Sequence, residues 1–535
     1  MIYRRRESRE GLGALGQLGV ELLLKPGRSL TREETCLRFS NYVCLLLSLL
    51  AFCLYSYFDS RLLTVRSLDF WHCLSLGQVD QIYSLFPGDL NQYYTGGLLA
   101  LVLRAVWNLP VWLLSQGLPA YADSALALLW GRGYQLFFFV WTLSLVRQLA
   151  LLLGFKRLQR QRLLSLLLSG TWFFTSVFYF SSSDIIWIFF ALLCFKYSLE
   201  GRVYQGAIFA ALAIHHKPFF AAAYLLLLCC TERQVLRFLN RLLLCFFSPI
   251  LERYLLSFWP SYREALVHNS FSPQIDFMKG FGLGLSGLNA NLLLLLFLSI
   301  FLYALFAPRL DLQRQSQTFF FRLCLMAGSY LVFFDQPLYR YSMLLPWLYF
   351  LLVAEKRRFG ELLAVDTGLG FAAIWLSVLK RQPSFDLVAF RNSLLLPLEQ
   401  RGGGRYDFGF QVFGAWARPE SLAFILLSTC TLLWLLYQAY LIFPKRGILY
   451  RSYVLLLRQL LTEGGEAEGQ KPSSPELKYL CSHLRRSGLG LQTARPYHLR
   501  QDLRHWICRR HRFFLLLRPL VLCFWMAFSL YLYWA

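Results

Sequence analysis

The sequence has 535 residues, of which 57% are hydrophobic and only 16% are charged. Soluble domains contain about 25% charged residues, so this composition excludes an ordinary soluble protein. Apolar runs recur along the whole length, and many approach the roughly 20 residues that a helix needs to cross a bilayer. We therefore expect an all-α, polytopic membrane helix bundle of about 12–13 transmembrane helices, with helical outer loops and the lipid bilayer as a partner.

The net charge of +24 does not indicate a nucleic-acid partner. The basic residues stand in short clusters between apolar runs, as they do in the cytoplasmic loops of membrane proteins. The 13 cysteines lie mostly inside apolar runs, and they have neither the paired spacing of a zinc site nor the pattern of a disulfide framework. The sequence thus predicts no cofactor; a divalent metal ion is left open, but nothing indicates one.

Composition divides the chain into four parts. Residues 1–40, with a run of arginines near their start, are predicted to be a basic cytoplasmic segment. Residues 41–443 form the membrane domain. Residues 444–512 form a basic cytoplasmic tail, in which residues 463–475 have the composition of a flexible linker. The apolar run within residues 513–535 is predicted either to span the membrane or to lie in its interface.

The first predicted span, residues 41–58, crosses outward and is followed by an outer loop. Charge asymmetry then sets the direction of the later spans, because basic loops favour the cytoplasmic side. These spans are predicted at residues 131–153, 163–180, 185–199, 203–214, 219–230, 242–258, 288–306, 319–334, 342–354, 361–379 and 421–443.

Residues 96–118 are apolar enough to span, but they contain Arg104, Asn108 and Pro110. If this stretch spans, the strongly basic segment 156–162 falls on the outer side and violates the charge rule. If it stays at the outer face, the basic loops nearly all face the cytoplasm. We therefore interpret it as an interfacial or re-entrant hairpin.

The outer loop at residues 67–89 combines carboxylates, a histidine and several aromatic side chains. Asp69 is the candidate general base, since a carboxylate held in a partly dry site has its pKa tuned toward the working pH. His72, three residues later, is a candidate for substrate binding. Taken alone, Asp69 is more simply explained as a helix N-cap, because Asp is common there.

A second polar cluster, His215-His216-Lys217-Pro218, lies between two apolar segments at the predicted outer face. Lys217 suits a lipid-linked phosphate, because an ammonium binds phosphate as a point charge, and His216 would assist. The competing explanation is that Lys217 only reaches toward the membrane interface.

Three further residues at the predicted outer face are candidates for substrate binding. Asp184 begins a predicted helix and is also a plausible cap. Asp335 and Arg340 either pair with each other or line a site.

The order of these motifs resembles the GT-C superfamily of integral-membrane glycosyltransferases, over roughly residues 41–230. Its polyprenyl-phosphate-mannose-dependent members, such as GPI mannosyltransferase I and the bacterial polyprenol-phosphate mannosyltransferases, have an acidic first outer loop. Asp69, Gly77 and Tyr83 fit that loop pattern, and His216 and Lys217 fit a later helix end. Several members carry an acidic pair in the first loop, whereas Ser67 stands two residues before Asp69 here, which puts metal dependence in doubt.

The resemblance implies an inverting transferase that moves a sugar, mannose or another hexose, from a polyprenyl-phosphate donor to an outer glycan, lipid or protein acceptor. It implies Asp69 as the base and Lys217 as the phosphate ligand. We expect a bacterial cell membrane, with the active site facing outward. The alternatives are a multi-pass transporter or lipid flippase, which usually has internal repeats, and a non-catalytic assembly scaffold.

Overall fold

The structure is a computed structural model. It describes residues 32–84, 97–117, 124–170, 177–178, 182–268, 285–307, 309–333, 343–353, 359–360, 363–364, 366–368, 385–387, 517–523 and 526. The predictions for the basic tail and its linker, and for Asp335 and Arg340, lie outside these residues.

The described part is almost entirely helical, which confirms the all-α fold class. In chain order its elements are α2 (Arg32–Leu54), β1 (Tyr55–Tyr57), α3 (Phe58–Ser75), the 3-10 helix η2 (Val79–Tyr83), α4 (Leu98–Gly117), α5 (Ala125–Leu152), α6 (Arg157–Ser169), α8 (Asp184–Leu199), α9 (Val203–His216), α10 (Phe220–Thr231), α11 (Val235–Leu256), α12 (Pro260–His268), α14 (Leu285–Phe306), α15 (Leu312–Phe333), α16 (Leu345–Val353) and β2 (Phe385–Leu387). The two short strands pair antiparallel, with Ser56 opposite Asp386.

Three of the described helices are long and apolar enough to cross a membrane, which supports membrane association. They cover Thr35–Leu54, Leu98–Gly117 and Ala125–Leu152. Phe220–Thr231 and Leu293–Phe306 are shorter apolar helices. A helix rises about 1.5 Å per residue, so the 12-residue α10 alone does not reach across a hydrocarbon core of about 30 Å, whereas the 22-residue α14, which contains Leu293–Phe306, does.

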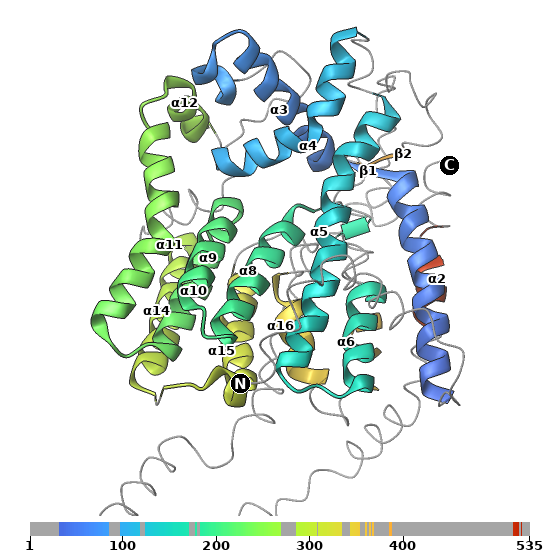
Figure 1. Ribbon diagram of the computed structural model, residues 1–535, viewed down its shortest axis with the longest axis vertical. Helices are drawn as coiled ribbons and strands as arrows, with labels where there is room; N and C mark the ends of the chain where they lie inside the picture. The colour runs from blue at the N-terminus through green and yellow to red at the C-terminus, as the bar shows by residue number, and fades with distance from the viewer. Residues whose placement is uncertain are drawn as a thin grey trace, which may run out of the picture.

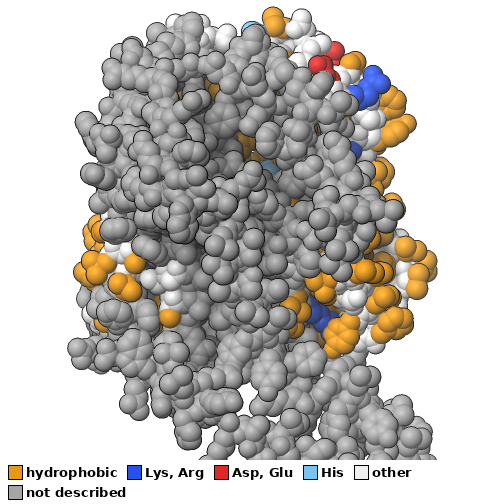
Figure 2. Space-filling view, turned by 180° about the vertical axis from the view of Figure 1, so that it is seen from behind, with side chains coloured by type: hydrophobic (Ala, Val, Ile, Leu, Met, Phe, Trp, Pro, Cys, Tyr) orange, Lys and Arg blue, Asp and Glu red, His pale blue; other side chains and the backbone are white. Residues whose placement is uncertain are grey.

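One surface of the bundle is strongly apolar. On α11, Leu236 is 77% and Leu243 64% exposed, and on α14 Phe306 is 82% exposed. Figure 2 shows hydrophobic side chains gathered on the side of the molecule where these two helices lie. Large contiguous apolar patches are rare on soluble proteins, and this one suits contact with lipid tails.

Within the predicted outer loop at residues 67–89, α3 continues through Asp69 to Ser75 and η2 follows, in agreement with the helical outer loops that the sequence predicts. The hairpin predicted at residues 96–118 is wrong in form, since α4 is one helix with Pro110 inside it, while its placement at the outer face stays a prediction. A proline inside a helix removes one backbone hydrogen bond. Membrane helices tolerate this loss, because neighbouring helices and local adjustments satisfy the freed backbone group. Figure 1 shows α3, α4 and α12 together at one end of the bundle, which we call the upper end.

Helix α8 belongs to the main core and packs against α5 and α9. It is apolar on every face, with Trp187, Phe190 and Cys194 all buried. A helix that is hydrophobic all round is a buried helix, so α8 carries Asp184 at its start into the interior. The turn between the end of α9 and the start of α10 lies at the same end of the bundle as the start of α8 (Figure 1).

The C-terminal apolar run packs into the bundle. Leu522 and Met526 belong to the main hydrophobic core. Arg518 is fully buried, and its Nη2 lies 2.7 Å from Oδ2 of Asp366. The hydroxyl of Tyr349 on α16 donates to the other oxygen of Asp366 at 2.8 Å. A charged hydrogen-bonded network of this kind joins the end of the chain to its middle.

Candidate active site

Asp69 lies in the interior of α3, eleven residues after its start at Phe58, so it is not an N-cap. Its side chain is 19% exposed, and its Oδ2 lies 3.6 Å from Nη1 of Arg66, one helical turn earlier. The same Arg66 Nη1 donates to the carbonyl oxygen of Ser84 at 3.0 Å, which ties η2 to α3. Arg66 therefore serves as the counter-ion of Asp69 without saturating the carboxylate.

Burial raises the pKa of Asp69 to about 6, against the opposing effect of the nearby Arg66 and His72 charges. A buried Asp whose charged form loses hydration behaves in this way unless a partner compensates fully. A carboxyl group with a pKa near 6 is ionised at neutral pH and still basic enough to accept a proton. This is the range in which general bases work.

Hydrogen bonds to α4 hold α3 in place. The indole Nε1 of Trp71 donates to the carbonyl oxygen of Ala105 at 2.7 Å. The amide of Asn108 donates to the hydroxyl of Ser67 at 2.6 Å. Two polar links on the same face fix the rotation of α3, and hence the direction of Asp69.

Aromatic rings support the same region from the other side. Tyr83 of η2 packs edge-on against Tyr262 of α12 at 4.9 Å and tilted against Trp259 at 6.1 Å. Phe70 belongs to the same buried cluster. His72 is exposed in the last turn of α3, so it is within reach of an incoming ligand and contributes to the field at Asp69.

The second part of the site brings Asp184 and Lys217 together. Lys217 follows α9 as its C-terminal cap, and its Nζ lies 3.5 Å from Oδ1 of Asp184. That oxygen also accepts from the indole Nε1 of Trp187 at 3.2 Å. Its other oxygen, Oδ2, is buried and has no hydrogen-bond partner. Asp184 is the first residue of α8 and not its cap, which is Ser183.

His215 is an anchor for this end of α9. Its Nδ1 lies 2.8 Å from Oε2 of Glu252, and its Nε2 lies 2.9 Å from the hydroxyl of Ser248. The other oxygen of Glu252 accepts from the backbone N–H of Leu99 at 2.7 Å. The pair of His215 and Glu252 therefore joins α4, α9 and α11, immediately before the two residues predicted to bind phosphate.

His216 differs from its neighbour. Its ring stacks on Phe190 at 5.7 Å, and its Nε2 is buried without a hydrogen-bond partner. Burial, with smaller contributions from Arg104 and His215, lowers its pKa to about 3. The ring is therefore neutral near pH 7. It offers a hydrogen bond to a ligand and no positive charge, so Lys217 carries the charge of the pair.

Helix α4 connects the two parts of the site. Its Ala105 and Asn108 bind α3, while Leu99 binds Glu252 and Arg104 lies close enough to affect the pKa of His216. The guanidinium of Arg104 is buried and lies over the ring of Tyr134, 5.3 Å from its centroid. Asp69 lies on α3 and Lys217 follows α9, and both helices contact α4.

Sequence reasoning did not select Arg66, Arg104 or Glu252 as site residues. The sequence did contain a signal for Arg104 and Glu252, because each is a charged residue inside an apolar run, and such a residue is a functional candidate by default. Among the residues that the structure describes, no group of three or more His, Cys, Asp or Glu side chains is arranged to hold a metal ion.

Replacement of Gly97 by alanine tests the contact between α4 and α9. A Cβ atom at residue 97 would lie 2.7 Å from the carbonyl oxygen of His215 and 3.1 Å from Oε2 of Glu252. We expect Gly97→Ala to lower the stability of the purified protein by about 1–3 kcal/mol, the usual cost of overpacking. Thermal unfolding in detergent measures this.

Gly117→Ala, at the other end of α4, is the matched control, because a Cβ there meets nothing within 4 Å. Equal unfolding midpoints for the two variants would contradict the close approach of α4 to α9.

The comparisons with known proteins leave the residues themselves as the basis for assigning a function. No protein-family model, no curated protein and no solved structure matches the chain.

Proposed function

We propose that the chain is a polytopic membrane glycosyltransferase of the GT-C type, embedded in a bacterial cell membrane with its active site facing outward. It transfers a hexose such as mannose from a polyprenyl-phosphate donor to a glycan, lipid or protein acceptor, with inversion at the anomeric carbon. The observation that carries this proposal is Asp69, a mostly buried carboxyl group whose pKa is raised to about 6. Such a group suits a general base at neutral pH.

The reaction is a single displacement. The acceptor hydroxyl oxygen forms the bond to the anomeric carbon while Asp69 takes the hydroxyl proton. The bond between that carbon and the phosphate oxygen breaks, and its electron pair leaves with the lipid phosphate. Lys217 supplies the positive charge that stabilises the leaving phosphate. Asp184, 3.5 Å from Lys217 Nζ, fixes the ammonium group in position.

Two further features support the proposed function. Asp69 and Lys217 come from different helices and are joined through α4, so a base and a phosphate ligand have separate supports. The exposed apolar surface of α11 and α14 suits a protein that meets lipid-borne substrates in the bilayer.

The decisive experiment is sugar transfer by the purified chain, supplied with a panel of polyprenyl-phosphate sugars and extracted acceptors. We expect transfer from at least one donor, with release of polyprenyl phosphate. An active chain that moves the lipid across a vesicle bilayer without transferring its sugar would contradict the transferase and favour the flippase.

The proposed topology has its own test. With about 12–13 spans, residues 1–40 and 444–512 would be cytoplasmic, and Asp69, Lys217 and Asp335 would face outward. We expect single cysteines at positions 72 and 217 to react with an impermeant maleimide added to intact cells, and one at position 158 to stay unlabelled until lysis. Labelling of position 158 from outside would contradict this topology.

The pH dependence of turnover tests the role of Arg66. Because Asp69 must lose its proton to act, we expect activity to rise with pH through a midpoint near 6. Arg66 lowers the pKa of Asp69, so Arg66→Gln should move this midpoint to higher pH. Arg66→Lys, which keeps the charge, should move it less. The readout is the pH profile of kcat/KM, and an unchanged midpoint in Arg66→Gln would contradict the assignment.

A further inference from the structure

A large polar cavity lies at the end of the bundle opposite Lys217. Its volume is about 680 Å³, and its walls come from three turns: the end of α8 with the start of α9, the end of α10 with the start of α11, and the α14–α15 connection. Lys217 and Asp184 stand at the other ends of α8, α9 and α10. Ligand pockets have volumes of about 300–1,000 Å³, so the cavity has room for a polar headgroup.

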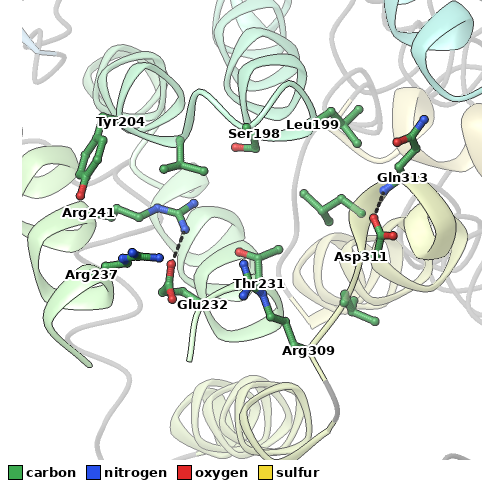
Figure 3. A pocket seen from close by; sticks show the side chains of 14 residues that line it. Ser198, Leu199, Tyr204, Thr231, Glu232, Arg237, Arg241, Arg309, Asp311 and Gln313 are labelled. Carbon is green, nitrogen blue, oxygen red and sulfur yellow. Dashed lines mark hydrogen bonds and ion pairs between the residues drawn. The ribbon is translucent and has the colours of Figure 1, made fainter. Parts of the chain in front are cut away.

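Three arginines and two acids line this cavity: Arg237, Arg241, Arg309, Glu232 and Asp311. In Figure 3 the three arginines lie around Glu232 and Thr231, while Asp311 lies on the far side, beside Gln313. Asp311 immediately precedes α15, and its Oδ1 accepts from the backbone N–H of Gln313 at 3.2 Å. This is the position and bond of an N-cap, so its charge serves the helix.

The carboxylate of Glu232 is also engaged. Its Oε1 accepts from the backbone N–H groups of Arg233 and Gln234 at 3.0 and 3.1 Å, and its Oε2 pairs with Nη1 of Arg241 at 3.4 Å. Although burial alone would raise the pKa of Glu232, these bonds together with the charge of Arg309 lower it. Glu232 is therefore a fixed anion whose hydrogen-bonding capacity is largely used.

The arginines keep unused capacity. Arg241 is 2% exposed, and its Nε is buried without a hydrogen-bond partner. Arg237 and Arg309 are exposed, and neither makes a hydrogen bond or ion pair with another described residue. A buried guanidinium N–H without a partner is costly, and an anionic oxygen beside it would satisfy it. Guanidinium groups are the preferred protein ligands of phosphate, because their planar fork matches two phosphate oxygens.

The walls of the cavity are held in position. The backbone N–H of Leu310 donates to the carbonyl oxygen of Cys230 at 2.9 Å. The guanidinium of Arg233 donates to the carbonyl oxygens of Ala304, Leu305 and Ala307 at the end of α14. The α14–α15 connection is therefore fastened to α10, and the arginines lie in a preformed cavity.

The surroundings indicate where the anion comes from. Exposed apolar residues, which suit lipid tails, stand close in the chain to the arginines of the cavity: Leu236, Leu239 and Leu243 on α11, and Phe306 at the end of α14. In the proposed topology this end faces the cytoplasm, where anionic lipids attract basic clusters. A lipid can therefore place its phosphate against the arginines and its tails against the apolar surface.

We propose that this cavity binds the phosphate group of an anionic membrane lipid, through Arg237, Arg241 and Arg309. The site is separate from the one assigned to sugar transfer, and only its placement at the cytoplasmic face rests on the proposed topology. Binding here ties the α14–α15 connection to the lower ends of α9, α10 and α11.

The test uses the full chain purified in detergent, titrated with short-chain phosphatidylglycerol while thermal unfolding and lipid retention in native mass spectrometry are followed. The test variant carries Arg237→Gln and Arg309→Gln. Both residues are exposed, so we expect the two substitutions to leave the fold intact. The control is Arg253→Gln with Arg263→Gln, which removes the same charge from exposed positions near the upper end. Phosphatidylcholine and inorganic phosphate are titrated in parallel.

We expect phosphatidylglycerol to raise the unfolding midpoint of the wild type and of the control equally. In the cavity variant its apparent Kd should rise about tenfold or more, because two charge-assisted contacts are lost. Phosphatidylcholine should bind more weakly. Equal weakening in both variants, or none in the cavity variant, would overturn the site. Protection by inorganic phosphate at the same concentrations as the lipid would overturn the lipid assignment. The outcome is independent of sugar transfer, since only binding is measured.

Discussion

Asp69→Asn is expected to lower the turnover of sugar transfer by about a hundredfold to ten-thousandfold, the usual loss when a general base is removed. Asn has the size of Asp and keeps one acceptor oxygen, but it cannot take a proton. The fold should be retained, because Asp69 is not a cap of α3. Its carboxylate is paired with Arg66 at the long distance of 3.6 Å. Steady-state kinetics with varied donor concentration measure the effect.

Two variants sharpen this prediction. Asp80→Asn changes an exposed carboxylate on the neighbouring η2 and should leave turnover near the wild-type value. Lys217→Gln should weaken donor binding as well as slow the step, whereas Asp69→Asn should leave donor affinity nearly unchanged. Turnover of Asp69→Asn close to that of Asp80→Asn would remove Asp69 from the chemistry.

Replacement of Arg518 by methionine is expected to destabilise the protein by about 3–5 kcal/mol, because it removes the buried cation that pairs with the Asp366 carboxylate. Arg518 is fully buried, and Asp366 is paired with it at 2.7 Å. Tyr349 still donates to Asp366, but a neutral hydroxyl does not replace a cation. The measurement is the midpoint of thermal or denaturant unfolding in one detergent.

The double variant Arg518→Met with Asp366→Leu is the control for this pair. It removes both charges, so it should recover much of the stability lost in the single variant. A single variant as stable as the wild type would mean that the C-terminal run does not dock through this ion pair.

The positions of the helices follow from the apolar runs. The spans predicted at residues 185–199, 203–214 and 219–230 correspond to α8, α9 and α10 with shifts of one or two residues. Basic segments were harder to assign to a helix or a loop. Residues 157–162 were interpreted as a cytoplasmic loop, yet they form the first turns of α6. Charge describes which side of a membrane a segment favours, and it does not exclude a helix, because Arg and Gln have good helix propensity.

The candidate site was predictable only in part. The polar residues at positions 69, 184 and 217 stood out from their apolar surroundings, but their partners did not. Arg66 lies one turn before Asp69, which becomes visible only once α3 is known to be a helix. The pairing of Lys217 with Asp184 joins the ends of two helices, and no local pattern encodes such a contact.

The pairing of Lys217 with Asp184 has a consequence for the rate of product release in the proposed reaction. A sugar phosphodiester donor has one negative charge, whereas the released lipid monophosphate approaches two at neutral pH, so a lone ammonium would hold the product more tightly than the substrate. Asp184 lies 3.5 Å from that ammonium and competes for it in every turnover. In the proposed reaction the carboxylate would act as an internal competitor that limits product inhibition.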